Sequence, residues 1–143
     1  MRQNGFTITE MVVIIAVFAI IFWLLVTGST SFIGNQLLYA ERDTLVSLLR
    51  DARSRAMGNI NQSNHGIFID TDKYISFDGA SYAARDQAKD ALFPKSSGVT
   101  TAGPNEIMFS ALDGQSNASG TITVLTNTGS STISINNEGQ INW

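Results

Sequence analysis

The strongest pattern in the chain is an unbroken run of sixteen apolar residues, Met11–Val26. As an α-helix this run measures about 24 Å, and residues 6–9 with Thr27 bring it close to the ~30 Å of a bilayer core. We therefore expect a transmembrane helix here. Arg2 precedes the run, and a basic residue favours the cytoplasmic side, so the rest of the chain is expected across the membrane.

A second pattern follows, in which apolar residues recur every three or four positions, as on one face of a helix. These positions are Leu38, Leu45, Leu48, Leu49, Ala52 and Ala56, with Leu37 and Glu41 on the flanks. We expect one helix from Phe6 to about Met57, roughly 80 Å long, with a stop signal at Gly58. The segment Gly28–Gly34 is rich in Gly, Ser and Thr, which predicts a bend or local melting.

The remainder alternates apolar and polar positions, which is the period of half-buried β-strands. Strands are expected at 66–70, 73–77, 106–110, 121–126, 132–136 and 140–143, with a polar, irregular stretch at 81–90. Thr71 and Asp72 predict a hairpin turn, which explains the neighbouring aspartates better than a calcium site does. Laying one antiparallel sheet on the apolar helix face gives an α+β fold.

Glu10 stands at the head of the apolar run, where a carboxylate is costly. Insertion scales put an intramembrane carboxylate at roughly 2.5–3.5 kcal/mol, so such a group normally has a partner or a function. Immediately before it, Gly5 ends a short leader that carries one basic residue and no acidic one. Together these features indicate a processing signal joined to an assembly element.

The string Gly5-Phe6-Thr7-Ile8-Thr9-Glu10, followed by an apolar helix, resembles the signature of type IV prepilins. The resemblance implies cleavage between Gly5 and Phe6 by a membrane-embedded prepilin peptidase, and methylation of the new Phe6 amine. It also implies the type IV pilin fold, a long N-terminal helix packed on an antiparallel sheet. The domains would be a leader (1–5), a transmembrane and assembly helix (6–27), its amphipathic continuation (28–59) and a β-rich globular domain (60–143).

The resemblance also gives Glu10 a role. Its carboxylate would pair with the Phe6 ammonium of a neighbouring subunit and so set the axial register of each subunit, because opposite charges attract strongly in a low dielectric. The alternative is a carboxylate that snorkels to the cytoplasmic interface. An ordinary secretory signal peptide is a further alternative, with a cleavage site at Val26–Gly28. Glu10 and the helical pattern that resumes after Gly28 argue against it.

Within the prepilin class, Arg42–Ala56 resembles the helix end of the H-type (GspH/FimT-like) minor pseudopilins. Short stretches at 106–109, 120–124 and 134–141 are similar to that family too. The chain departs from its DNA-binding members because no basic residue follows Lys95. Since the net charge is −3, no nucleic-acid partner is expected.

Enzymatic chemistry finds little support in the composition. The chain has no cysteine and one histidine, His65, which we expect in an exposed loop before the first strand. Neither form of glycine-rich phosphate loop occurs. We therefore expect no catalytic residues, metal or cofactor, and the chain is not expected to be an enzyme.

The function expected from these observations is structural: a minor pilin or pseudopilin of a type IV pilus or type II secretion-like filament. Its partners would be the cytoplasmic membrane, the prepilin peptidase, other subunits and, indirectly, an assembly platform with its ATPase. It would begin as a single-pass membrane protein and end in the filament. Two alternatives stay open: a major pilin, or a secreted or membrane-anchored binding domain unrelated to filaments.

Overall fold

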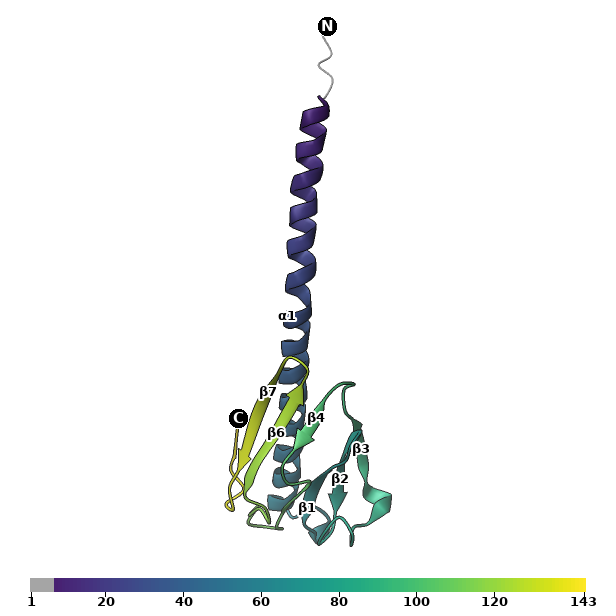
Figure 1. Ribbon diagram of the computed structural model, residues 1–143. Coiled ribbons are helices and arrows are strands. Elements are labelled where there is room, and N and C mark those ends of the chain that lie inside the picture. The colour runs from purple at the N-terminus through teal and green to yellow at the C-terminus, as the bar shows by residue number, and fades with distance from the viewer. Residues whose placement is uncertain (1–6) are drawn as a thin grey trace. The chain divides into compact units, whose positions relative to one another are not determined.

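The computed structural model describes residues 7–143, and the side chains of residues 26–34 lie outside that description. The chain divides into two compact units, residues 1–33 and residues 34–143. Helix α1 (Ile8–Met57) begins in the first unit and ends in the second (Figure 1). Its end agrees with the sequence pattern, whereas Phe6, the expected first residue, lies outside the described residues. The segment Gly28–Gly34 is α-helical, and the bend expected there stays a prediction.

In the second unit, the expected apolar stripe forms the buried face of helix α1. Leu45, Leu49, Ala52 and Ala56 have no exposed surface. Glu41, expected on the flank of the stripe, is buried within it and only 4% exposed. The helix gives way to a short 3-10 turn, η1 (Ile60–Gln62), after Asn59 takes the left-handed conformation (φ 50°), which asparagine tolerates better than most residues.

The first sheet has four antiparallel strands in the order β3-β2-β1-β5. The expected hairpin is formed by β1 (His65–Ile69) and β2 (Lys73–Asp78), and the Asp70 N–H donates to the Lys73 carbonyl at 2.9 Å across the turn. The outer strands are β3 (Ala91–Pro94) and β5 (Glu106–Phe109).

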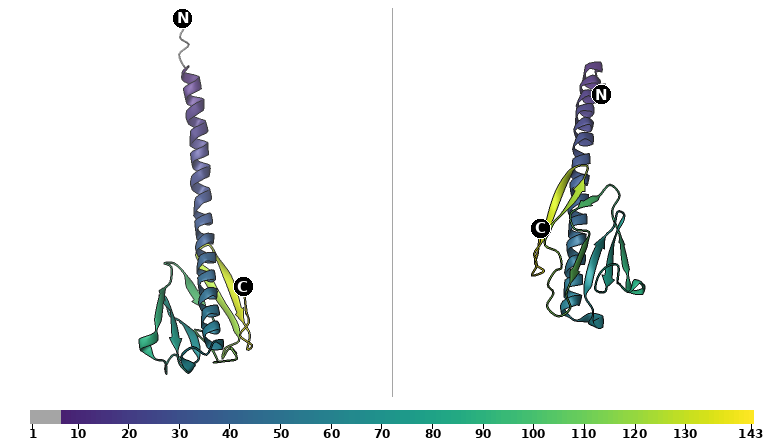
Figure 2. Two further views of the ribbon diagram at one scale, coloured as in Figure 1. Left: turned by 180° about the vertical axis from the view of Figure 1, so that it is seen from behind. Right: turned by 60° about the horizontal axis from the view of Figure 1, so that its bottom comes forward.

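The second sheet also has four antiparallel strands, in the order β4-β6-β7-β8. Its strands are β4 (Thr100–Ala102), β6 (Gly120–Thr126), β7 (Gly129–Ile135) and β8 (Ile141–Asn142). Both sheets share one core with the C-terminal part of α1 (Figure 2). The strand residues of that core include Ile67, Tyr74, Ile107, Phe109, Ile122, Val124, Ile133 and Ile135.

These strands confirm the α+β class and correct the expectation of a single sheet. The sequence pattern missed β3 and β4: β3 (Ala-Leu-Phe-Pro) has adjacent apolar residues and ends in proline, and β4 (Thr-Thr-Ala) contains no large apolar residue, so neither shows a period of two. It also placed Trp143 in the last strand. Trp143 lies beyond the end of β8 and is 49% exposed.

The irregular stretch 81–90, which includes the 3-10 turn η2 (Gln87–Lys89), covers the outer face of the first sheet. The Tyr82 ring stacks on Phe68 with the centroids 3.8 Å apart and meets Phe77 edge-on at 5.7 Å. Gly66 makes room for this arrangement, because a Cβ there would lie 2.6 Å from the Phe77 ring. This sheet is therefore covered on both faces.

Candidate functional site

The first unit presents an apolar helical surface that is exposed in the single chain. Residues Ile8–Leu25 have a mean hydropathy of 2.7, and none of their side chains is buried. Phe22 is 70% exposed and Leu25 is 68% exposed. Eighteen helical residues span about 27 Å, so by length and composition this segment can cross a membrane.

The helix start contains a capping arrangement that the pattern analysis missed. The Thr7 hydroxyl accepts a hydrogen bond from the Glu10 N–H at 3.3 Å, and the Thr7 carbonyl accepts one from the Met11 N–H at 3.2 Å. Thr7 and Glu10 thus have the Thr-x-x-Glu spacing of a capping box, a signal readable in the sequence. Glu10 also lies in the first turn of the helix, where a negative charge is favourable.

The Glu10 carboxylate itself has no ion-pair partner among the described residues. It is exposed, and it is the one charged side chain of the apolar segment Ile8–Leu25. The two residues expected to flank the processing site, Gly5 and Phe6, lie outside the described residues. Glu10 therefore offers a carboxylate at the head of an apolar helix, available to a cation from elsewhere.

His65 differs from expectation: it is the first residue of β1 and is completely buried. Its Nδ1 lies 2.6 Å from Asp78 Oδ1, an ion-pair distance at an angle outside hydrogen-bond geometry. Its Nε2 lies 2.8 Å from the Ile60 carbonyl oxygen, and Asn61 Nδ2 donates to Asp78 Oδ2 at 2.7 Å. Both ring nitrogens of His65 therefore lie close to an oxygen atom, Nε2 in a hydrogen bond and Nδ1 in a close contact with the carboxylate. The pair anchors the turn η1 to the sheet, which is a structural role.

Glu41 belongs to a second buried polar cluster, between α1 and the first sheet. Its Oε2 accepts a hydrogen bond from the Ser96 N–H at 3.3 Å. Its Oε1 and the Tyr74 hydroxyl lack hydrogen-bond partners of standard geometry among the described residues. Lys95 Nζ donates to the Asp70 carbonyl at 2.5 Å and lies 5.2 Å from the Tyr74 ring centroid.

The surroundings shift two pKa values in this cluster. Burial raises the pKa of the Tyr74 hydroxyl, and the Glu41 carboxylate raises it further, because ionisation would place two negative charges side by side. Burial lowers the pKa of Lys95, against the opposing effect of nearby carboxylates, first that of Glu41. Each shift comes from packing and neighbouring charge, which is the behaviour of a structural cluster.

The raised pKa of Tyr74 predicts a pH effect on stability. Unfolded tyrosine loses its proton near pH 10 while folded Tyr74 keeps it, so this stabilisation is present below pH 10 and is lost as pH rises further. Above pH 10, the free energy of unfolding of wild type should therefore fall more steeply with pH than that of Tyr74→Phe, by up to about 1.4 kcal/mol per pH unit. Urea unfolding of the two proteins in detergent measures this difference. The lowered pKa of Lys95 makes the free energy of unfolding rise with pH, and because both proteins contain Lys95, this effect cancels in the comparison. Tyr39→Phe, at an exposed site, should follow wild type; equal slopes for wild type and Tyr74→Phe would contradict the prediction.

Within residues 7–143, no group of three His, Cys, Asp or Glu side chains is placed to hold a metal ion. A family model described as the prokaryotic N-terminal methylation motif matches residues 1–26. No curated protein and no solved structure matches the chain. The matched residues contain Gly5, Phe6 and Glu10 and the whole apolar segment Ile8–Leu25, and the motif indicates a structural subunit instead of a known enzyme family. The motif and the apolar helix together support a type IV prepilin-like protein, a pilin or pseudopilin subunit anchored by a single membrane helix.

Proposed function

We propose that this chain is a minor pilin or pseudopilin, cleaved after Gly5, methylated at Phe6 and assembled through α1 into a type IV pilus or type II secretion-like filament. The observation that carries the proposal is the apolar segment Ile8–Leu25, which has no buried residue in the single chain and is headed by Glu10. The methylation motif over residues 1–26 supports the same reading. The similarity of Arg42–Ala56 to the H-type minor pseudopilins favours a minor subunit.

The exposed segment has two successive environments in this proposal. Before assembly, lipid surrounds it, and the second unit lies outside the cytoplasm. After assembly, the same segments of neighbouring copies surround it. Because lipid tails are as apolar as the side chains, the transfer brings little hydrophobic gain, and packing between helices must supply the cohesion. Extraction therefore calls for an energised machine, an assembly platform driven by an ATPase.

Glu10 sets the register in this assembly. The Phe6 amine is free after cleavage and stays cationic when it carries a methyl group. The Glu10 carboxylate of one subunit pairs with this ammonium on its neighbour, and the attraction grows as water is excluded between the helices. A wrong axial position would leave both charges unpaired in an apolar bundle, so the pair selects one position.

A major pilin would share all these features and would differ in abundance within purified filaments. A membrane-anchored binding domain unrelated to filaments is the second candidate, and it would need neither the peptidase nor Glu10. The observation in its favour is that residues 34–143 form a compact unit of their own.

The first experiment is intact-mass and amino-terminal analysis of the membrane-associated protein from its native host. The expected chain begins at Phe6 and is heavier than residues 6–143 by one methyl group. The same analysis in a strain without prepilin peptidase should return the uncleaved chain. A chain that begins near Ser29 would mean export of a soluble domain, and the proposal would then be wrong.

A further inference from the structure

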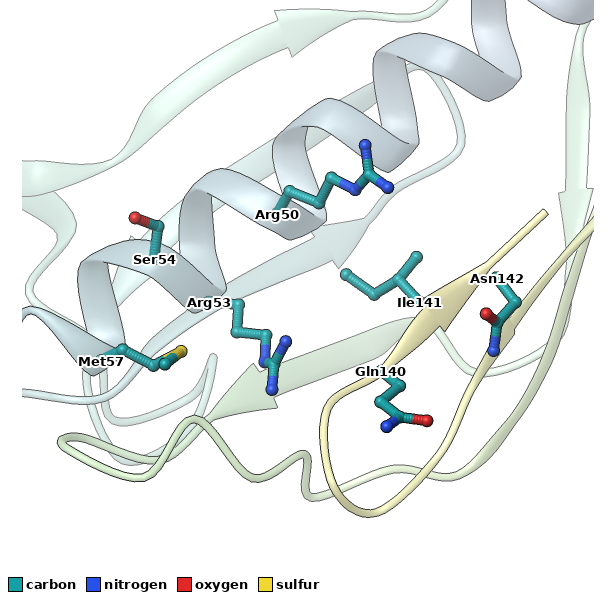
Figure 3. A pocket seen from close by; sticks show the side chains of 7 residues that line it. All are labelled: Arg50, Arg53, Ser54, Met57, Gln140, Ile141 and Asn142. Carbon is teal, nitrogen blue, oxygen red and sulfur yellow. The ribbon is translucent and has the colours of Figure 1, made fainter.

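A groove runs between α1 and the C-terminal end of the second sheet, within residues 34–143. One part encloses about 600 Å³ and is lined by the helix residues Arg50, Arg53 and Ser54 and, opposite them, by Gln140, Ile141 and Asn142 (Figure 3). A volume of this size falls in the range of ligand-binding clefts. We call the whole groove, with the continuation described next, the arginine groove.

A second hollow of about 430 Å³ continues the groove along α1 and shares Arg50 with the first part. Trp143 lines it and lies under Arg50, with the guanidinium carbon 4.0 Å from the ring centroid. Arg42 and Asp43 stand in this part, and they neutralise each other through an ion pair of 2.7 Å. Stacking on Trp143 holds the Arg50 guanidinium in place while its N–H edges stay open.

The charges of the groove are unbalanced. Among the described residues, no carboxylate lies within ion-pair distance of Arg50 or Arg53, whereas Lys73, Arg85 and Lys89 all have acidic partners. Within the described part of the chain, the Arg53 side chain donates to backbone carbonyls, to Glu138 at 3.1 Å and to Gly114 at 3.4 Å, and to no side chain. The other polar side chains of the first part, Ser54, Gln140 and Asn142, are exposed and uncharged.

From this geometry we infer that the arginine groove binds a carboxylate-bearing segment of a partner protein, outside the membrane. Guanidinium groups match carboxylates with paired hydrogen bonds, and the amides and hydroxyl around them suit the main chain of a peptide. A nucleic acid fits less well, because its affinity comes from many phosphate contacts, and the groove offers two unpaired cations on a chain of net charge −3. The inference does not rest on the proposed function, since it concerns the second unit alone.

The test uses the full-length chain in detergent with Trp23→Phe, so that Trp143 is the single tryptophan reporter. The probe is a capped nonapeptide of alternating glutamate and serine, and its control is the same peptide with glutamine for glutamate. The acidic peptide should change the Trp143 emission saturably, and added salt should weaken this binding. Arg50→Gln should raise the Kd about tenfold or more, and Arg50→Lys should raise it less.

Arg55→Gln is the matched control, because it removes the same charge from the same helix outside the groove, and it should bind the peptide as wild type does. Arg53→Gln adds a second test within the groove, with circular dichroism to confirm that the variant keeps the secondary structure of wild type, because Arg53 also donates to the Gly114 and Glu138 carbonyls. The inference is overturned if the peptide does not bind, or if Arg55→Gln weakens binding as much as Arg50→Gln. Tighter binding of an oligonucleotide of equal charge, lost in Arg50→Gln, would also overturn it, in favour of a nucleic-acid site.

Discussion

Replacing Glu10 with glutamine is expected to reduce incorporation of the chain into filaments by about tenfold or more, while cleavage after Gly5 and membrane insertion stay normal. Glutamine keeps the size of the side chain and its capacity for hydrogen bonds, and it removes the charge that, in the proposed assembly, pairs with the Phe6 ammonium of the neighbour. The measurement is the ratio of chain in sheared filaments to chain in membranes, by quantitative immunoblotting.

This substitution separates the two roles available to Glu10. A capping box accepts glutamate or glutamine, so a capping role alone predicts that Glu10→Gln assembles like wild type. Thr7→Ala is the matched control: it removes the hydroxyl cap and leaves the carboxylate, and incorporation should stay within about twofold of wild type. If Glu10→Gln is incorporated normally and Thr7→Ala is not, the pairing role is wrong and Glu10 serves the helix start.

The second large effect is expected at the buried pair of His65 and Asp78. Asp78→Ala should lower the free energy of unfolding by about 3–5 kcal/mol, because it removes one member of a buried pair whose other member, His65, has no exposed surface, and because it removes the acceptor of Asn61. Against a total stability of about 5–15 kcal/mol this is a large fraction. Urea unfolding of the full-length chain in detergent, followed by circular dichroism, measures it.

Asp72→Ala is the control, since the Asp72 side chain is exposed and lies 3.8 Å from Lys73 Nζ in a surface ion pair; its effect should be within about 0.5 kcal/mol. The double variant His65→Leu/Asp78→Leu should be more stable than Asp78→Leu alone, because it leaves no buried polar ring without its partner. A loss below about 1 kcal/mol for Asp78→Ala would show that the pair contributes little to the fold.

Long periodic patterns made the helix and its buried face predictable. The residues from Leu45 to Ala56 recur often enough to define one face, and the β1–β2 hairpin has alternating strands on both sides of a turn signal. The division into two sheets was not predictable in this way, because it depends on which strands pair, and pairing is not encoded in the period of a single strand.

The buried polar groups were missed for a related reason. His65 can be buried because its partner Asp78, thirteen residues later in the chain, lies opposite it where β1 pairs with β2. Glu41 can be buried because Lys95 and Ser96, in the segment after β3, lie close to its carboxylate. Such partners are brought together only by the tertiary fold. The Thr7 cap is different, because the Thr-x-x-Glu spacing of a capping box can be read in the sequence. Glu10 was instead interpreted as an assembly residue, because it stands at the head of an apolar run.

The edge strands of the two sheets are short, which affects how copies of the chain can pair with one another. The outer strands β3, β5, β4 and β8 have four residues or fewer, β3 ends at Pro94, and the inner strands have five to seven residues. Short edges and an edge proline give a foreign strand few backbone groups to pair with. In the proposed filament, where many copies are held at high local concentration, these edges would let the helices associate without the sheets pairing edge to edge into amyloid-like aggregates.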